Sequence, residues 1–329
     1  PYLVITCPRG AGISARPHCR TPVVYSTDAG EGMLAALHRL RENLARTGKP
    51  REVEGVLDLY LIRPGGLLIA GLLRPTPISP NAVSLASLIA GWITAWYLFQ
   101  TAAAGNDARF TLFAAIALYV HSAFDSADGQ LARWRGKSSD LGRLIDGVSD
   151  YLTFAAVYLA IGFGLASRGG SMAVPVTLAV VGGLSHALQC AIVEYQRNLF
   201  RYHVYATPLA TADAPREHAV QLRRESGAGL GIAHQVHILY SWTQQAVGGS
   251  SLRLRERIGG WLDEHPGDRN RIARIFATEN TARLRLWALL APNSHKVGMI
   301  VGALPLLATA RFGSLGLYWY LLYVVVGLN

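Results

Sequence analysis

Long apolar stretches without a charged side chain are the feature that most constrains what this chain can fold into. Six stand out, over residues 81–99, 110–124, 152–167, 172–193, 297–310 and 312–329. A helix needs about 20 residues to cross the hydrocarbon core of a bilayer, so the shorter stretches must extend into polar residues at one end. One such stretch is compatible with a buried helix of a soluble protein, but six predict an all-α, polytopic integral membrane protein with six transmembrane helices.

The composition agrees with a membrane protein. Only 16% of the residues are charged, against about 25% in soluble domains. The three cysteines, Cys7, Cys19 and Cys190, lie far apart and lack the spacing of a zinc site, so no disulfide framework is expected.

The distribution of basic residues predicts the orientation. If the N-terminus is cytoplasmic and all six stretches cross, only Arg109, Arg168 and Arg311 of the 31 Lys and Arg residues face the outside. Both termini are therefore expected in the cytoplasm. The same asymmetry explains the net charge of +10 through attraction to an anionic leaflet, without nucleic acid as a partner.

Five segments are predicted along the chain. They are an N-terminal cytoplasmic segment (1–51), a juxtamembrane surface helix (52–78), transmembrane helices 1–4 (79–195), an inserted cytoplasmic helical segment (196–296) and transmembrane helices 5–6 (297–329). Pro64-Gly65-Gly66 is expected to break the apolar run from Val56 to Leu73. The first transmembrane helix is expected to begin with Ser79 as N-cap and Pro80 at its first position.

Two pairs of aspartates carry the chemistry. Asp125 and Asp128 are three residues apart, and Asp146 and Asp150 are four apart, so on helices each pair shares a face. Residues 134–141 are long enough for a turn between antiparallel helices. The fold is therefore expected to bring four carboxylates together at the cytoplasmic ends of the second and third transmembrane helices.

Carboxylates in a membrane are unfavourable unless they are paired or ligated. Hard oxygen ligands suit Mg²⁺, Mn²⁺ or Ca²⁺ rather than zinc, and two metal ions between shared carboxylates favour displacement at phosphorus. Gly129, Ala132 and Gly142 permit close approach of a helix or ligand, and Arg133 can bind a phosphate. Two alternatives remain open, a membrane cation transporter that uses the aspartates and a catalytically silent scaffold.

Residues 125–150 match the pattern D-x2-D-G-x2-A-R-x8-G-x3-D-x3-D at every fixed position. In this motif the chain resembles the CDP-alcohol phosphotransferase family, also called CDP-alcohol phosphatidyltransferases. The predicted layout of membrane helices extends the likeness over 79–195 and 297–329. The resemblance implies transfer of a substituted phosphoryl group from a CDP-linked alcohol to the hydroxyl of an acceptor alcohol, with release of CMP.

The resemblance also implies roles for individual residues. Asp125, Asp128, Asp146 and Asp150 would hold two divalent metal ions, Mg²⁺ or Mn²⁺ (Ca²⁺ in a crystal). Asp146 and Asp150 would be catalytic, with Asp150 as the general base. The residues expected to bind CDP are Asn81, Asp128, Gly129, Ala132, Arg133 and Gly142.

The expected donor is CDP-diacylglycerol, which places the reaction in phospholipid biosynthesis in a prokaryotic inner membrane. A polar donor such as CDP-inositol is the variant, because residues 28–74 faintly resemble the segment before the membrane domain in nucleotidyltransferase fusions. The expected acceptor is a lipid or polyol alcohol. For the assembly, a homodimer is one option. Candidates for an anionic headgroup or acceptor are Lys137, Arg143, Arg197 and Arg201, with His295 and Lys296 at comparable depth.

Overall fold

A computed structural model of the chain describes residues 51–136, 140–169, 171–206, 257–305 and 315–327, with residues 235 and 246 singly. The chain divides into two compact units, Pro1–Arg41 and Glu42–Asn329, and all described residues lie in the second. These residues form helices and turns and contain no strand. Lys137, nearly all of the predicted segment 1–51 and much of 196–296 lie outside the described residues.

Four long helices form the centre of the second unit. They are α3 (Pro80–Ala103), α4 (Ala108–Trp134), α5 (Asp140–Ala166) and α6 (Ala173–Tyr205). Each is long and apolar enough to cross a membrane, α5 over Ile145–Ala166. Large apolar side chains such as Leu85, Trp92 and Leu184 are more than half exposed on their outer faces, as expected for surfaces that contact lipid. The first four predicted membrane helices are therefore confirmed as helices of spanning length.

Two shorter helices overlap the fifth and sixth predicted stretches. α11 (Pro292–Gly302) begins before the predicted stretch at residue 297, with Pro292 in its first turn. α12 (Leu315–Leu322) continues into a π-helical turn, η7 (Tyr323–Gly327). Residues 306–314 lie outside the described part of the chain, so the count of six membrane helices stays a prediction.

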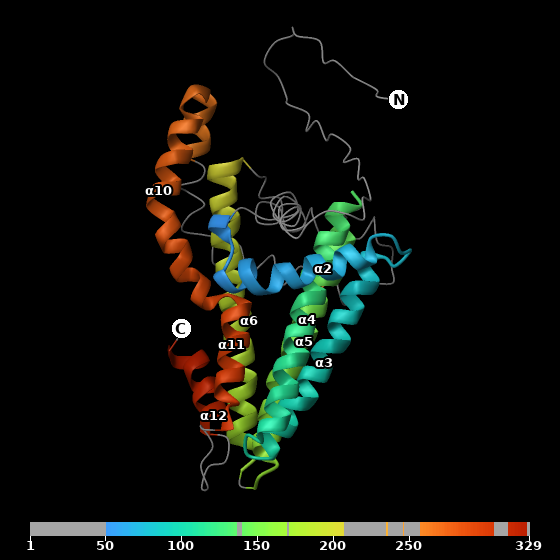
Figure 1. The fold of residues 1–329 in the computed structure, drawn as a ribbon. Coiled ribbons are helices and arrows are strands. Elements are labelled where there is room, and N and C mark those ends of the chain that lie inside the picture. Colours follow the sequence, from blue (N-terminus) through green and yellow to red (C-terminus); the bar gives the residue numbers. More distant parts are fainter. Residues whose placement is uncertain are drawn as a thin grey trace. The chain divides into compact units, whose positions relative to one another are not determined.

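Helix α2 (Arg63–Leu73) lies crosswise to the long helices (Figure 1) and packs against α4. It follows a short 3-10 turn, η1 (Arg51–Val53), and a π-helical turn, η2 (Asp58–Ile62). Pro64 lies in the first turn of α2, where its missing N–H leaves no helical hydrogen bond unmade. Gly66 lies at the crossing with α4, where an added Cβ would come within 2.7 Å of Ser126. Pro64-Gly65-Gly66 therefore lies in the first turn of α2 and permits its close packing. A helix is present within the predicted segment 52–78, and its place on a membrane surface stays a prediction.

The start of α3 agrees with the sequence. Ser79 is the N-cap, and its hydroxyl accepts a hydrogen bond of 3.2 Å from the N–H of Ala82, while Pro80 occupies the first turn. Because the cap satisfies a backbone donor that the helix cannot, it fixes where α3 begins.

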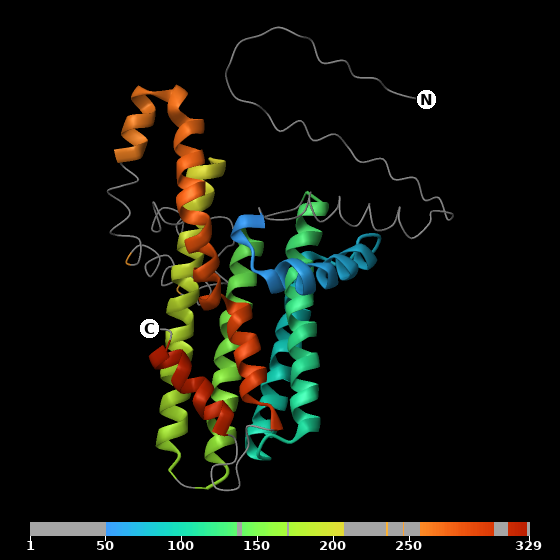
Figure 2. The ribbon, with the colours of Figure 1, turned by 60° about the vertical axis from the view of Figure 1, so that its left-hand side comes forward.

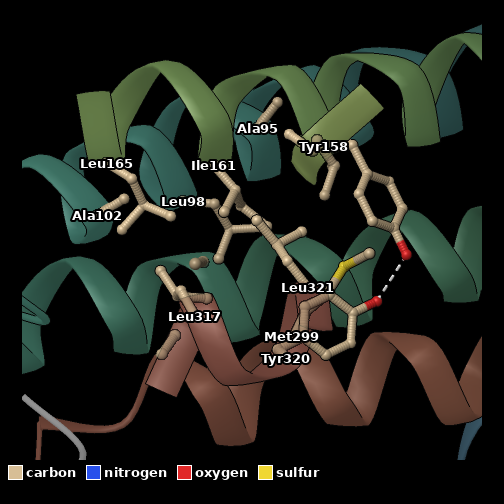
Figure 3. Close-up of a cluster of buried hydrophobic side chains, with 14 of the residues drawn as sticks. Ala95, Leu98, Ala102, Tyr158, Ile161, Leu165, Met299, Leu317, Tyr320 and Leu321 are labelled. Atoms are coloured by element: carbon tan, nitrogen blue, oxygen red, sulfur yellow. Dashed lines mark hydrogen bonds between the residues drawn. The ribbon is translucent and has the colours of Figure 1, made fainter. Parts of the chain in front are cut away.

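The largest hydrophobic core joins the C-terminal helices to the long helices (Figure 3). It contains Leu98 of α3, Ile161 of α5, Met299 of α11 and Leu321 of α12, each inaccessible to solvent. Within it, the hydroxyls of Tyr158 and Tyr320 are hydrogen-bonded at 2.8 Å. The segments predicted as 79–195 and 297–329 therefore fold together.

A second helical layer extends beyond the level of α2 (Figure 2). It contains the end of α6, which passes the predicted boundary at residue 195 without interruption, and α10 (Arg269–Trp287). Phe200 of α6 and Leu284 of α10 are buried in one cluster together with Val53. A 3-10 turn, η5 (Ala288–Leu290), then leads from α10 directly into α11.

Gly164 allows the close approach of α5 to α3, and its replacement tests this packing. A Cβ at Gly164 would lie 2.6 Å from the carbonyl oxygen of Phe99, and such overpacking costs about 1–3 kcal/mol. We expect Gly164→Ala to lower the thermal unfolding midpoint of the purified protein. The matched control is Gly147→Ala in the same helix, where an added Cβ meets no atom within 4 Å and the midpoint should stay or rise. Equal midpoints for the two variants would contradict this role of Gly164.

Candidate active site

The candidate site lies between the ends of α4 and α5 that precede and follow the turn, where α2 packs against α4. Both helices pack extensively along α3, and α4 ends at Trp134 while α5 begins at Asp140. Gly136 in the intervening turn has φ of 63°, a conformation that glycine adopts without strain. The turn therefore falls within residues 134–141, where the sequence predicts it.

The structure brings the four predicted aspartates together. The carboxylate of Asp150 interacts electrostatically with those of Asp125 and Asp146, and it shares a hydrogen bond with Asp125 across the two helices. The carboxylate of Asp128 also interacts with those of Asp125 and Asp150. Asp128 is buried, and the other three are half-buried. The contact between Asp125 and Asp150 thus links the two aspartate pairs across α4 and α5, and the four residues together are called the acidic cluster.

This cluster has donor chemistry suited to a hard cation. Two carboxyl groups in hydrogen-bonding contact need a proton or a cation between them, since both oxygens otherwise only accept. All the side-chain ligands are carboxylate oxygens, which Mg²⁺ and Mn²⁺ prefer. Among the residues that the structure describes, however, no three or more His, Cys, Asp or Glu side chains are grouped so as to hold a metal ion. The two metal ions therefore stay a prediction.

Ser84 of α3 positions the buried aspartate. Its hydroxyl donates a short hydrogen bond to Oδ2 of Asp128. Asn81 is exposed in the first turn of α3, three residues before Ser84, so it lies on the same side of that helix. Sequence reasoning missed Ser84, although Ser84, Ser87 and Thr94 are all buried and their spacing of three and seven residues marks one face.

Arg133 lies close to both aspartate pairs. Its guanidinium interacts electrostatically with Asp128 and with Asp146. It folds back over Gly129, where an added Cβ would lie 3.1 Å from Nη1 of the arginine. The small residue at position 129 therefore allows the guanidinium to lie against α4, and the exposed side chain of Arg133 remains accessible to a ligand. Ala132 and Gly142, also predicted to bind CDP, are half-buried near the same turn.

Arg135 connects the end of α4 to the loop between α2 and α3. Its guanidinium donates hydrogen bonds to the carbonyl oxygens of Leu73 at 2.6 Å and Thr76 at 2.8 Å, and also to those of Arg74 and Ile78. This loop leads into the N-cap of α3, so Arg135 positions the first turn that carries Asn81. No sequence pattern indicates this contact, because the partners are backbone atoms of a distant segment.

A buried ion pair lies beside the candidate site. Arg63 at the start of α2 pairs with Glu54, and both side chains are at most 10% exposed. Burial lowers the pKa of the Arg63 guanidinium from its ordinary value, against the opposing effect of the Glu54 and Asp58 charges. An arginine remains charged at neutral pH, and its charge acts on Arg133.

The predicted acceptor residues are less well grouped. Arg201 forms an ion pair of 2.8 Å with Glu194 and also contacts Asn198. Arg197 is half-buried on the same helix. The side chains of Arg143 and Lys137 lie outside the described part of the chain. His121, one turn before Asp125, is buried with its Nδ1 2.9 Å from the hydroxyl of Ser87, as expected for a packing histidine.

Comparison with known proteins identifies the domain that contains this site. Residues 77–212 match the model of the CDP-alcohol phosphatidyltransferase family. The matched range includes the four aspartates, Arg133 and the four long helices. Searches of curated proteins and of solved structures each found no match. The domain implies a membrane transferase that moves a phosphate-containing group from a CDP-alcohol to an acceptor.

Replacement of Arg135 tests its role in holding the loop before α3. Arg135→Met removes the hydrogen bonds to the loop carbonyls, and hydrogen bonds from a charged donor contribute about 1.5–3 kcal/mol. We expect amide hydrogen exchange of Thr76 and Ala82 to become at least about tenfold faster, since 1.4 kcal/mol corresponds to a factor of ten. Arg109→Met, at the other end of α4 and 81% exposed, is the control and should leave exchange at these amides unchanged. Unchanged exchange in Arg135→Met as well would show that the loop does not depend on this arginine.

Proposed function

We propose, on the premise that the chain belongs to the CDP-alcohol phosphatidyltransferase family, that it transfers a substituted phosphoryl group from CDP-diacylglycerol to an acceptor alcohol and releases CMP. The observation that carries this proposal is the meeting of the four carboxylates of α4 and α5 beside Arg133. Such a product would place the enzyme in phospholipid biosynthesis. A polar donor such as CDP-inositol uses the same chemistry and is the variant to test beside it.

The reaction requires one bond to form and one to break at the same phosphorus. The acceptor oxygen attacks the phosphorus that bears the donor alcohol, and the bond from this phosphorus to the CMP oxygen breaks. The proton of the acceptor hydroxyl passes to the carboxylate of Asp150, which contacts Asp125 across the site. Positioned carboxylates serve as general bases when they lie within hydrogen-bond reach of the proton.

Binding of the donor is assigned to residues of α3, α4 and the turn. Arg133 can pair with the oxygens of the diphosphate, because a guanidinium binds phosphate through two parallel hydrogen bonds. Asn81, Gly129, Ala132 and Gly142 would line the cytidine side of the site. The small residues among them leave room for the nucleotide to approach the helix backbone.

Two divalent ions, Mg²⁺ or Mn²⁺, are part of the proposal. Asp125, Asp128, Asp146 and Asp150 would hold them through carboxylate oxygens. When bound, such ions neutralise charge on a diphosphate and improve CMP as a leaving group. Ser84 would hold Asp128 in its orientation through the hydrogen bond that links α3 to α4.

The membrane setting follows from the apolar helices. We place the site at the cytoplasmic side of an inner membrane, with α2 on the membrane surface and both termini in the cytoplasm. The exposed leucines of α2, Leu68 and Leu72, are 66% and 68% accessible, and a surface helix would bury such side chains among the acyl chains. A site between helices at this depth would be open to a donor that carries acyl chains.

Release of CMP from purified protein tests the proposed reaction. We expect release from CDP-diacylglycerol with an alcohol acceptor and Mg²⁺ or Mn²⁺, and loss of release when the metal is chelated. Asp150→Asn should lower the rate by about 10²–10⁴-fold, the usual contribution of a general base. Arg133→Ala should raise KM for the donor. The control is Arg109→Ala, at the opposite end of α4, which should leave KM and kcat at their wild-type values.

The donor panel should include CDP-inositol, and the same samples should be reconstituted into liposomes. Release only from the polar donor would replace CDP-diacylglycerol in the proposal. Absence of CMP release from every donor, combined with cation movement that survives Arg133→Ala and Gly142→Leu, would instead favour a cation transporter.

A further inference from the structure

Lys296 is a buried cation in a helix outside the matched family domain. It lies in α11 and is 7% exposed, while the family match ends at residue 212. Burying an ammonium group is unfavourable unless charges and hydrogen bonds compensate for the lost water. An ionisable residue inside a membrane bundle therefore points to a functional role.

The contacts of Lys296 place it between the two helices that carry the aspartates. Its Nζ donates a hydrogen bond of 2.9 Å to the hydroxyl of Ser122 in α4. The same ammonium lies 5.7 Å from the ring centroid of Phe154 in α5, within the range of a cation–π contact.

These two partners lie one helical turn from the central pair of aspartates. Ser122 is three residues before Asp125, and Phe154 is four residues after Asp150, so each shares a face with its aspartate. Asp125 and Asp150 are the two carboxylates that share a hydrogen bond across the site. Lys296 therefore lies about one helical turn from this pair, on the side away from the turn between α4 and α5.

The charge of Lys296 acts on the cluster. It interacts electrostatically with Asp150, yet among the described residues it forms no ion pair with a carboxylate. Ser122 is its one hydrogen-bond partner in the described part of the chain. The ammonium thus attracts Asp150 without occupying its oxygens.

We propose that Lys296 is a positioning residue for Asp150 and that α11 thereby completes the active site of the matched domain. The inference rests on the transferase function proposed above. The ammonium holds the carboxylate of Asp150 toward α4, where the acceptor hydroxyl delivers its proton. Lys296 itself gives up no proton in the reaction, and its contacts with Ser122 and Phe154 keep α4 and α5 at the spacing that the pair requires.

A double-mutant cycle on the full-length protein tests this inference, with Lys296→Met, Asp150→Asn and the combined variant. Lys296→Met should lower kcat for CMP release at least about 30-fold while KM for the donor changes less than about threefold. In the combined variant kcat should fall no further than in Asp150→Asn alone, because Lys296 acts through that carboxylate. Arg109→Met removes an exposed cation from the same bundle and should leave kcat unchanged.

Thermal unfolding of the same variants provides a second measurement, which does not depend on catalytic turnover. Lys296→Met leaves the carboxylates of the cluster without this cation, so it should unfold at a lower temperature than the wild type, and the loss should be smaller when Asp150 is already replaced by Asn. If Lys296→Met does not fold, the combined variant is compared with Asp150→Asn, and Lys296→Arg is compared with the wild type. The first two should differ little in kcat, and Lys296→Arg, which keeps the charge, should retain most of the wild-type kcat. Additive effects on both kcat and unfolding, or a kcat within twofold of the wild type in Lys296→Met, would overturn the inference. Absence of CMP release in the wild type would refute the proposed function, while the unfolding cycle would still report the coupling of Lys296 and Asp150.

Discussion

The meeting of four carboxylates inside a bundle of apolar helices is the constraint on which this structure depends. Isolated carboxylates at such a depth are strongly unfavourable, and like charges at close range add repulsion. The described residues supply part of the compensation through the Ser84 hydroxyl on Asp128, the guanidinium of Arg133 and the ammonium of Lys296. These groups come from three helices, so the acidic cluster exists only when all three are in place. In the proposed reaction, metal ions and the proton of the acceptor hydroxyl would neutralise the remaining negative charge.

α3 provides the surface on which this arrangement is built. One face of it carries small and hydroxyl side chains, so α4 and α5 approach closely, as at Gly164 against Phe99. The same face supplies Ser84 to Asp128 and Ser87 to His121, which fixes α4 in rotation as well as distance. Packing and polar contacts therefore favour the same position of α4 relative to α3. A helix with only large apolar residues on this face would separate α4 from α5 and leave Asp128 without a donor.

Patterns within single helices could be predicted from the sequence, whereas contacts between distant helices could not. The charge-free stretches predicted α3 to α6, Ser79 and Pro80 predicted the start of α3, and the aspartate spacing placed each pair on one face. The roles of Ser84, Arg135 and Lys296 depend on partners 44, 62 and 174 residues away in the chain, and no local spacing reports such partners. The glycines of Pro64-Gly65-Gly66 are a related case, because an added Cβ there would meet Ser126 and Tyr119 of another helix. Local composition does not report that tertiary packing requires small residues at these positions.

The helices beyond the matched domain are connected to the reacting groups through continuous packing. α10 is held against the extension of α6 by the cluster of Phe200 and Leu284, and η5 joins α10 to α11 with no intervening loop. Asn293 in the first turn of α11 donates a hydrogen bond to Asp58, which ties this turn to the segment that leads into α2. Lys296 follows one turn later. The position of Lys296 is thus influenced from both sides of α11, by the second helical layer through η5 and by η2 through Asp58. A displacement of α10 along α6 would therefore shift α11 and with it Lys296, so this outer layer contributes to the position of that cation relative to Asp150.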